Sequence, residues 1–453
     1  MSEIGFNRLR LNIDDTIVAC ATPPGRGAIS IVRLSGPRAI EIAERVFRGR
    51  KRVGEFKSHT AHLGCIFDGE LRFERVLLLL FRAPNSYTGE DIVEFHLHGG
   101  RVAIDWLIEI LVKNGARPAE PGEFTFRALV NGKMDLIQAE SIEEIISAQS
   151  RTALLSSVSR LEGRLSEWAR RLKERLWDIY TRLEASINFP EDEIEFDISA
   201  VYEELSKVRE ELETICANYD RNRFVFEGAE IVIAGPKNAG KSSLFNAIVG
   251  ENRAIVSDIP GTTRDIVEAH FELDNIPVVL YDTAGLGKPS DKLDSEGQKR
   301  AYEKLSSAHL ILFVVDGSVK VQKIEFKFPA KTVLVVNKID LGVAKENEKL
   351  FAEYRTIKTS ALLGTGIDEL LLFIRNYLAA NHCEPPLIGT ARQRETIRHL
   401  KNNIERAMGY LETQAELSAE ELKSAIENLS ELLGENLTPD LLESIFSRFC
   451  IGK

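Results

Sequence analysis

Three short motifs follow one another in the middle of the chain, and their residue types suit the binding of a nucleotide. GPKNAGKSS begins at Gly235 and matches the phosphate-binding pattern G-x-x-x-x-G-K-[ST]. DTAG begins at Asp282, and NKID begins at Asn337. In such a loop, glycines allow backbone N–H groups to surround phosphates, and the helix that follows adds a favourable dipole. A glycine-rich turn could imitate the first motif alone, but three motifs in this order predict a nucleotide site.

Individual side chains have separate roles in this prediction. We expect Lys241 to reach the β- and γ-phosphates and the hydroxyl of Ser242 to hold Mg²⁺. Asp282 ends the apolar run IPVVLYD, where its carboxylate can support the metal. Asp340 can accept hydrogen bonds from N1–H and the 2-amino group of guanine, whereas adenine offers neither donor. The pattern therefore favours guanine nucleotides over adenine nucleotides.

The flanking sequence indicates the elements that must position these motifs. EIVIA at 230–234 and TVLVV at 332–336 are typical of buried strands, and SSLFNAIVG at 242–250 is typical of a helix. Motifs at the ends of successive strands are the arrangement that an α/β nucleotide-binding domain uses.

The rest of the chain has two other kinds of pattern. Residues 1–130 alternate short strand-like runs with Gly and Pro, which predicts an α+β domain. Over 154–187, apolar residues recur every three or four positions, which predicts one long helix. A second helical run covers 200–219, and a helical tail begins near Ala391.

These patterns predict a multidomain α/β plus α protein. It combines an N-terminal α+β domain, a helical bundle made from two chain segments, and a P-loop domain inserted between those segments. The predicted boundaries are 1–130 for the N-terminal domain, 131–222 and 383–453 for the helical domain, and 223–382 for the nucleotide-binding domain. A length of 453 residues is enough for about three domains with separate cores.

Composition and charge narrow the classes of protein further. The net charge of −11 means that no global positive field attracts nucleic acid, so an RNA contact needs a local patch or a partner protein. The five cysteines are scattered without a C-x-x-C pair, which favours reduced thiols over a disulfide framework or a zinc site. The N-terminus lacks a signal-peptide pattern and no apolar run could span a membrane, so we expect a cytoplasmic protein.

Motifs along nearly the whole chain resemble those of the MnmE (TrmE) family of tRNA modification GTPases. They are DTIVACATPPGRGAISIVRLSG, NSYTGEDIVEFHLHGG, PGEFTFRA, NGKMDLIQAES, PKNAGKSSLFN, DIPGTTRD, DTAGL, NKID and the terminal FCIGK. The phosphate-binding loop and NKID are common to GTPases. GTTRD narrows the choice to the TrmE-Era group, and the motifs at both ends of the chain select this family.

The resemblance implies a homodimeric GTPase whose N-terminal domain binds folate and dimerises, and whose Ras-like G domain is inserted in the helical domain. It also implies an FAD-dependent partner of the MnmG type and action on the wobble uridine (U34) of certain tRNAs. A carboxymethylaminomethyl or aminomethyl group is added there at C5 with a one-carbon unit from a tetrahydrofolate derivative. GTP hydrolysis, with Mg²⁺ and K⁺, gates the modification.

Family positions carried over residue by residue define the candidate GTP site. Thr263 matches the switch threonine that binds Mg²⁺ together with Ser242. The K⁺ positions are Asn238, Ser257, Ile259 and Thr262. The GTP-binding positions are Asn238, Ala239, Gly240, Lys241, Ser242, Ser243, Ser257, Thr262, Thr263, Asp282, Thr283, Ala284, Gly285, Asn337, Lys338, Asp340, Ser360 and Ala361.

Two catalytic candidates come from the same resemblance. The residue after DTAG is Leu286, so the glutamine that orients water in Ras-type enzymes is absent. The family uses a switch glutamate instead; its position matches Asp294 here, and Glu296 is an alternative. Cys450 in the terminal motif is the second candidate, as a nucleophile or proton carrier in one-carbon chemistry, with packing of the folate pocket as the alternative role.

The folate (5-formyl-tetrahydrofolate) positions carried over are Arg33, Glu94, Lys133 and Lys453. A carboxylate can accept two hydrogen bonds from the amino and ring N–H groups of a pterin. Cations suit its carboxylate tail or formyl oxygen. His96 and His98 alternate on one strand face, but without a third ligand we interpret them as structural rather than metal-binding.

Two other classes of function compete with this interpretation. An Era-like ribosome-assembly factor would need an appended RNA-binding domain, such as one with a GXXG loop, and the flanks contain none. A folate-dependent one-carbon enzyme with a regulatory G domain would differ mainly in its acceptor. The nucleosides of tRNA from a deletion strain would distinguish this class from a tRNA-modifying enzyme.

Overall fold

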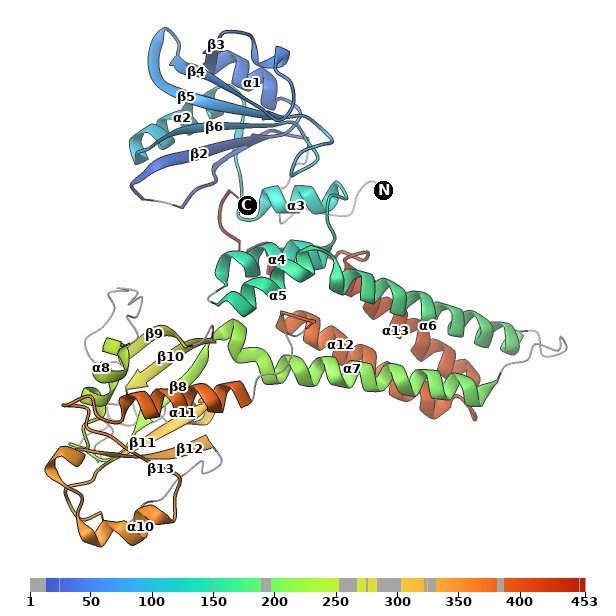
Figure 1. The fold of residues 1–453 in the computed structure, drawn as a ribbon. Coiled ribbons are helices and arrows are strands. Elements are labelled where there is room, and N and C mark those ends of the chain that lie inside the picture. Colours follow the sequence, from blue (N-terminus) through green and yellow to red (C-terminus); the bar gives the residue numbers. More distant parts are fainter. Residues whose placement is uncertain are drawn as a thin grey trace, which may run out of the picture. The chain divides into compact units, whose positions relative to one another are not determined.

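The chain separates into two compact units in the computed structural model (Figure 1). The described residues are 14–23, 25–148, 150–188, 197–251, 267–273, 276–282, 303–321, 324, 331–380, 387–447 and 449–452. The first unit comprises Met1–Ile146, Ser159–Arg209 and Glu395–Lys453, and the second comprises Ser147–Val158 and Glu210–Arg394. The domain boundaries predicted from the sequence remain predictions.

The N-terminal part of the first unit is a mixed sheet covered on one face by helices α1 (Ala39–Val46) and α2 (Arg101–Lys113). The strands are β1 (Ile17–Cys20), β2 (Gly27–Ser35), β3 (Phe47–Gly49), β4 (Thr60–Asp68), β5 (Leu71–Phe81), β6 (Ile92–Gly99) and β7 (Arg117–Pro118), with the short helix η1 (Val53–Glu55) after β3. Their order is β3-β4-β5-β6-β2-β1-β7. The helix-covered face holds the core, to which β6 contributes Val93, Phe95 and Leu97.

The opposite face of this sheet carries a row of side chains aligned by strand register. Leu63 pairs with Leu77, Leu77 with His96, and His96 with Ile31 across four strands. Leu63 is 54% exposed and Leu77 is 39% exposed. The next row pairs Glu94 with Arg33. Successive residues of a strand point to opposite faces, so one strand supplies both the core and this surface.

The helical part follows, and it corrects one prediction. The helices here are α3 (Glu123–Val130), α4 (Leu136–Ser147), α5 (Arg151–Leu161), α6 (Arg164–Asn188), α7 (Ile198–Glu227), α12 (Ala391–Tyr410), α13 (Ala415–Leu433) and α14 (Pro439–Phe446). Most of α5 belongs to the second unit, and α7 and α12 each cross the division between the two units. The single helix predicted over 154–187 is wrong, because the chain breaks between α5 and α6. Gly163 lies at the break with φ +95°, where a residue with a side chain would be strained.

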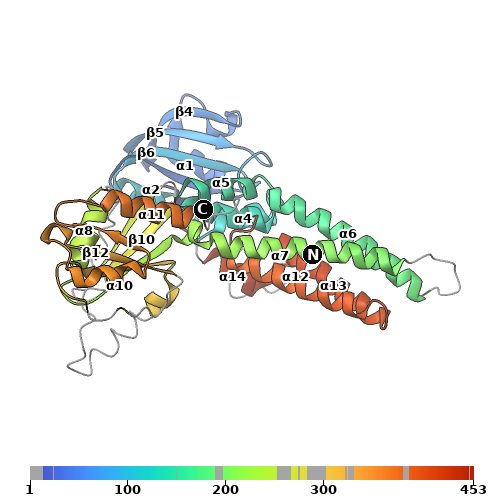
Figure 2. The same ribbon diagram turned by 60° about the horizontal axis from the view of Figure 1, so that its bottom comes forward.

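Segments far apart in the sequence pack together within the first unit. Helix α13 lies along α6 (Figure 1 and Figure 2). Phe446 and Phe449, near the C-terminus, join an apolar cluster with Phe126 of α3 and Leu136 of α4. Beyond them, a Cβ on Gly452 would lie 2.3 Å from the carbonyl oxygen of Cys20, so only glycine allows this close approach. The C-terminal segment is therefore anchored against the end of β1.

A buried ionic network fixes α3 to the same region. Arg127 is fully buried, and its Nη2 donates to Asp15 Oδ1 at 2.6 Å and to Glu123 Oε1 at 3.0 Å. Its Nη1 donates to Glu90 Oε1 at 3.1 Å, and Arg117 bridges Asp15 and Glu123. Burial of Asp15 opposes its ionisation, but hydrogen bonds from Arg117 and Arg127 outweigh this and hold the pKa of Asp15 below its ordinary value.

The second unit contains a largely parallel sheet in the order β13-β12-β11-β8-β10-β9. Its strands are β8 (Ala229–Ala234), β9 (Val267–Leu273), β10 (Ile276–Asp282), β11 (Leu310–Asp316), β12 (Thr332–Asn337) and β13 (Thr356–Lys358). Only β9 pairs antiparallel, at the edge. The helices are α8 (Lys241–Glu251), α10 (Glu348–Ala352) and α11 (Ile367–Ala380), with short turns η3 (Ile339–Leu341) and η4 (Lys345–Asn347). The strands and helix predicted around the first and third motifs are confirmed.

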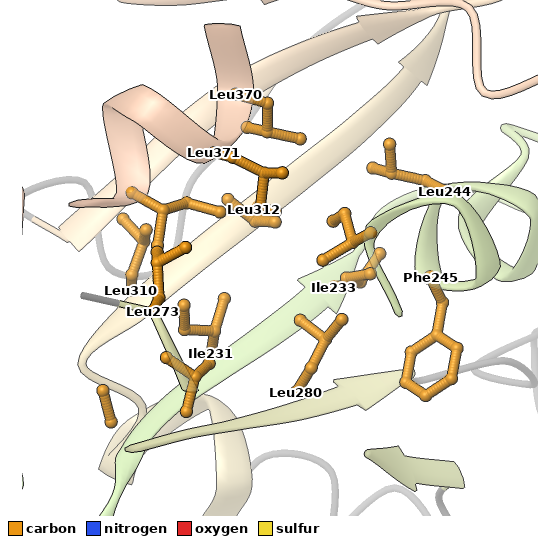
Figure 3. Close-up of a cluster of buried hydrophobic side chains, with 14 of the residues drawn as sticks. Ile231, Ile233, Leu244, Phe245, Leu273, Leu280, Leu310, Leu312, Leu370 and Leu371 are labelled. Carbon is orange, nitrogen blue, oxygen red and sulfur yellow. The ribbon is translucent and has the colours of Figure 1, made fainter. Parts of the chain in front are cut away.

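The core of this sheet is continuous from α8 to α11 (Figure 3). Ile233 of β8 lies beside Leu244 of α8, Ile231 lies near Leu273 of β9, and Leu312 of β11 lies toward Leu370 and Leu371 of α11. Such buried parallel strands are rigid supports for the loops at their ends. Among the described residues, no helix is long and apolar enough to cross a membrane.

Candidate functional site

The three motifs lie where neighbouring parallel strands of the second unit end. The phosphate-binding loop follows β8, Asp282 ends β10, and Asn337 ends β12. Strand β8 pairs with β10 on one side and with β11 on the other, and β11 pairs with β12. Ligands of open α/β sheets bind at the carboxyl ends of the strands, so this edge is the candidate site.

The phosphate-binding loop is held by glycines that no other residue could replace without strain. Gly235 has φ +141°, and a Cβ there would lie 2.1 Å from the carbonyl oxygen of Val314. Gly240 has φ +89°, and its Cβ would lie 2.3 Å from Nδ2 of Asn337. Asn238 between them has φ +64°, and its side chain is exposed. The loop therefore packs against β11 and β12 through its backbone, leaving the outer side of the loop open.

Asn337 joins this loop to a second one. Its side chain is 1% exposed; Nδ2 donates to the carbonyl oxygen of Ala239 at 3.1 Å. Its Oδ1 accepts from the backbone N–H of Ala361 at 3.0 Å and from Oγ1 of Thr359 at 3.3 Å. A buried amide with both ends bonded fixes its neighbours, because a buried polar group left without a partner costs about 1–3 kcal/mol.

Asp340 and Ser360 meet at the guanine side of the candidate site. Oγ of Ser360 donates to Oδ1 of Asp340 at 2.5 Å, and the backbone N–H of Leu363 donates to Oγ of Ser360 at 3.2 Å. Asp340 itself is exposed. Nζ of Lys338 contacts Asp316 Oδ2 at 2.7 Å, so Asp316 orients a residue of the motif. Asp316 was not among the predicted site residues; its place after LILFVV at the end of a strand was the available signal.

Lys241 and Asp282 lie at the phosphate side. Nζ of Lys241 donates to the carbonyl oxygen of Pro236 at 2.8 Å. Burial lowers the pKa of Lys241, although the charge of Asp282 acts in the other direction. Asp282 is 3% exposed, and within the described residues its Oδ1 is buried without a hydrogen-bond partner. A buried carboxylate oxygen in this state suits a cation or a metal-bound water, so the chemistry of Asp282 fits a Mg²⁺ site.

Several predicted site residues lie outside the described part of the chain. They are Ser257, Ile259, Thr262, Thr263, Thr283, Ala284, Gly285, Asp294 and Lys453, together with the alternative Glu296. Their roles in binding GTP, metal or folate therefore remain predictions.

The N-terminal sheet brings two of the predicted folate residues together. Nε of Arg33 donates to Oε1 of Glu94 at 2.8 Å, and both side chains are largely buried. The guanidinium carbon of Arg33 lies 5.7 Å from the ring centre of Tyr87 and 5.6 Å from that of Phe124. His96 lies 3.4 Å from Glu94 Oε2. Neither aromatic residue was singled out from the sequence, where each occurs inside a family motif.

Two other predicted residues of this region, Lys133 and Cys450, make contacts with other groups. Nζ of Lys133 donates to the carbonyl oxygen of Pro84 at 3.0 Å. Cys450 is exposed, and its carbonyl oxygen accepts from the N–H of Gly122 at 3.5 Å, two residues before Phe124. His98 contacts Glu74 at 3.2 Å. Within the described residues, no group of three or more His, Cys, Asp and Glu side chains is arranged to hold a metal ion.

Comparison with known proteins agrees with this architecture. A family model of the MnmE helical domain matches residues 136–450, and one of the GTP-binding protein TrmE N-terminus matches residues 16–133. The tRNA modification GTPase MnmE of Moorella thermoacetica is 40% identical, covering 97% of this chain and 100% of the relative. That of Aquifex aeolicus is 39% identical, with the same coverage.

One similar solved structure overlaps this chain only in part. Era in complex with MgGDPNP and a segment of 16S ribosomal RNA is 27% identical, with a TM-score of 0.28. The match covers 39% of this chain and 66% of that chain. A TM-score this low carries no argument about the fold, and the family models and full-length relatives decide the assignment. The chain belongs to the MnmE family, whose curated relatives are named tRNA modification GTPases.

Proposed function

We propose that this protein is the GTP-hydrolysing component of an enzyme that modifies the wobble uridine (U34) of tRNA at C5. It adds a carboxymethylaminomethyl or aminomethyl group with a one-carbon unit from a tetrahydrofolate derivative, together with an FAD-dependent partner. Membership of the MnmE family supports the tRNA substrate. The observation that carries the GTPase activity is the joining of the phosphate-binding loop to the guanine-reading loop through Asn337.

In this proposal the described residues bind and orient GTP. Backbone N–H groups of Asn238–Ser243 surround the phosphates, with Lys241 opposite the β- and γ-oxygens. Asp340, oriented by Ser360, accepts from guanine, and the backbone at Ala361 lies against the base. Thr283, Ala284 and Gly285 would continue from Asp282 toward the γ-phosphate.

Two cations would complete the GTP site. Mg²⁺ would be held by Ser242 and Thr263 with Asp282 behind them, and it would neutralise charge on the β- and γ-phosphates. K⁺ would be held by the side chain of Asn238, whose amide makes no hydrogen bond within the described residues, and by Ser257, Ile259 and Thr262. Asp294 would orient the attacking water by accepting its proton in a hydrogen bond.

A folate site on the N-terminal sheet fits the chemistry of its residues. Glu94 offers a carboxylate to the amino and ring N–H groups of a pterin, and Arg33 holds it in place from between two aromatic rings. Lys133 and Lys453 would contact the anionic tail or the formyl oxygen. Cys450 follows Phe449, which packs with Phe126 of α3, and in this proposal its thiol acts beside the folate site.

A cytoplasmic homodimer would pair through the same sheet. The row of Leu63, Leu77 and Ile31 leaves apolar surface on the face opposite the core, and a second copy can cover it. A protomer of 50.7 kDa would then occur as a pair, and a single-chain mass in light scattering would contradict this.

Replacing the guanine-reading carboxylate should change nucleotide preference. In Asp340→Asn the side-chain amide presents an N–H donor to the N–H donors of guanine, so GTP affinity should fall on the order of a hundredfold. Xanthine carries a carbonyl in place of the 2-amino group of guanine, so the variant should bind xanthosine triphosphate better than the native protein does. Isothermal titration with GTP, ATP and xanthosine triphosphate measures this. Asp368→Asn, an exposed acid on α11, is the matched control. Equal affinity of the native protein for ATP and GTP would end the purine assignment.

Hydrolysis should require K⁺ and an acid in the switch segment. Turnover of GTP should fall on the order of tenfold or more when Na⁺ replaces K⁺, and Asn238→Ala should remove most of the difference between the two ions.

Asp294→Ala should slow turnover on the order of 10²-fold while leaving GTP affinity nearly unchanged, as expected for an interaction made in the transition state. Phosphate-release assays at saturating GTP measure both.

Two results would contradict these assignments. Equal turnover in K⁺ and Na⁺ by the native protein would remove the K⁺ site. If Glu296→Ala slows hydrolysis and Asp294→Ala does not, the water-orienting acid is Glu296.

The thiol at the C-terminus should matter for tRNA modification and not for GTP hydrolysis. Cys450→Ser keeps the size of the side chain but supplies a far weaker nucleophile and acid. Modified wobble uridine, measured by mass spectrometry of tRNA nucleosides from a strain that carries only this variant, should be abolished with GTP turnover near normal. Cys216→Ser, at a half-buried cysteine of α7 that forms no disulfide, is the control. Normal nucleoside levels with Cys450→Ser would exclude this role.

A further inference from the structure

The N-terminal domain carries a dense run of cations that the proposed function does not use. Residues 48–52 read RGRKR, which we call the basic segment; Arg48, Arg50, Lys51 and Arg52 are all exposed. The segment lines a hollow of about 710 Å³ together with Arg45 at the end of α1. Such a density of positive charge stands out in a chain whose net charge is −11.

Buried apolar residues hold both ends of the basic segment. Phe47 before it is 4% exposed and Val53 after it is 1% exposed. The guanidinium carbon of Arg48 lies 4.3 Å from the ring centre of Phe67, which fixes that side chain. Just beyond, the N–H of Gly54 donates to Oε1 of Glu44 at 2.8 Å. The backbone is thus anchored while the cations between the anchors point to solvent, so binding costs little backbone entropy.

The charges of the basic segment are not neutralised locally. Within the described residues, the side chains of Arg50, Lys51 and Arg52 make no ion pair and no hydrogen bond. Three acids also line the hollow. Glu41 pairs with Arg38 and Arg45, Glu44 accepts from the backbone, and Glu55 makes no ion pair with a described residue, so four cations face one unengaged acid. By contrast, exposed cations on helices pair with carboxylates one turn away, as in Arg101–Asp105, Arg182–Asp178 and Lys207–Glu203.

We propose that the basic segment binds the phosphate backbone of the substrate RNA, an inference that rests on the proposed tRNA function. Three of the four cations are arginines, whose planar guanidinium matches two phosphate oxygens at once. Because the rest of the chain is acidic, a polyanion is repelled elsewhere and directed to this hollow. The segment has no exposed large apolar residue for insertion into a lipid surface, so an RNA backbone fits better than a membrane.

The test compares two triple variants of the full-length protein that change its net charge equally. One is Arg50→Ala with Lys51→Ala and Arg52→Ala; the control is Arg101→Ala with Arg182→Ala and Lys207→Ala. Binding of unfractionated tRNA is followed by fluorescence anisotropy at several salt concentrations. The first variant should bind tRNA about tenfold to a hundredfold more weakly, with the slope of log K against log salt reduced by about three. The control should bind nearly as the native protein does.

GTP turnover is measured for both variants alongside tRNA binding, so that a loss of RNA binding can be distinguished from misfolding. GTP turnover should be unchanged in both variants, because none of these residues belongs to the nucleotide site. Equal tRNA binding by the native protein and the first variant would overturn the role of the basic segment and leave the proposed function intact. If both variants bind tRNA equally weakly, the loss follows from overall charge, and this result would also overturn the role of the basic segment.

Two further outcomes separate other causes. If the native protein binds no tRNA, both this inference and the RNA part of the proposed function fail. Binding to vesicles of equal parts phosphatidylcholine and phosphatidylserine is measured as well. If the first variant binds tRNA normally but no longer binds these vesicles, the segment is a lipid contact and the RNA assignment is wrong.

Discussion

The side-chain amide of Asn337 is buried between two loops and bonds to both. Its nitrogen donates to the phosphate-binding loop at Ala239, and its oxygen accepts from the loop at Thr359 and Ala361. Gly240 has to be a glycine because this amide lies so close to it. The phosphate and guanine sides of the site are therefore set at a fixed separation, which is what recognition of one nucleotide requires. These two loops start at the ends of β8 and β13, and Asn337 lies between them at the end of β12.

In the first unit, a buried network of ion pairs holds separate segments of the chain together. The buried guanidinium of Arg127 pairs with Asp15, Glu90 and Glu123, and a buried charge of this kind is stable only because such partners compensate it. This network and the apolar cluster of Phe446 and Phe449 hold α3 and the C-terminal segment against one region of the N-terminal sheet. The terminal cysteine is consequently carried to the domain that holds Arg33 and Glu94, although it lies at the far end of the sequence.

Much of this architecture could be predicted from the sequence, because strand ends and turn chemistry are local signals. The strands before the phosphate-binding loop and NKID, and the helix that begins at Lys241, were predicted correctly, whereas the roles of these residues in binding GTP remain predictions. The break at Gly163 was missed because the apolar stripe continues across it. The contacts of Arg33 with Tyr87 and Phe124, and of Lys338 with Asp316, were also missed, because they join residues that only the tertiary fold brings together. The register that pairs Arg33 with Glu94 likewise depends on how β2 meets β6.

The central claim is that Asn337 assembles the guanine-nucleotide site, and GTP affinity measured by isothermal titration tests it directly. Asn337→Ala should weaken GTP binding on the order of 10²-fold or more, because it leaves buried groups of both loops unpaired. Asn347→Ala is the matched control: Asn347 is equally buried and bonds to the backbone of Val319 and Val321, away from the phosphate-binding loop. The control should lower stability and leave GTP affinity nearly unchanged. Equal GTP affinity in Asn337→Ala and the native protein would contradict the account.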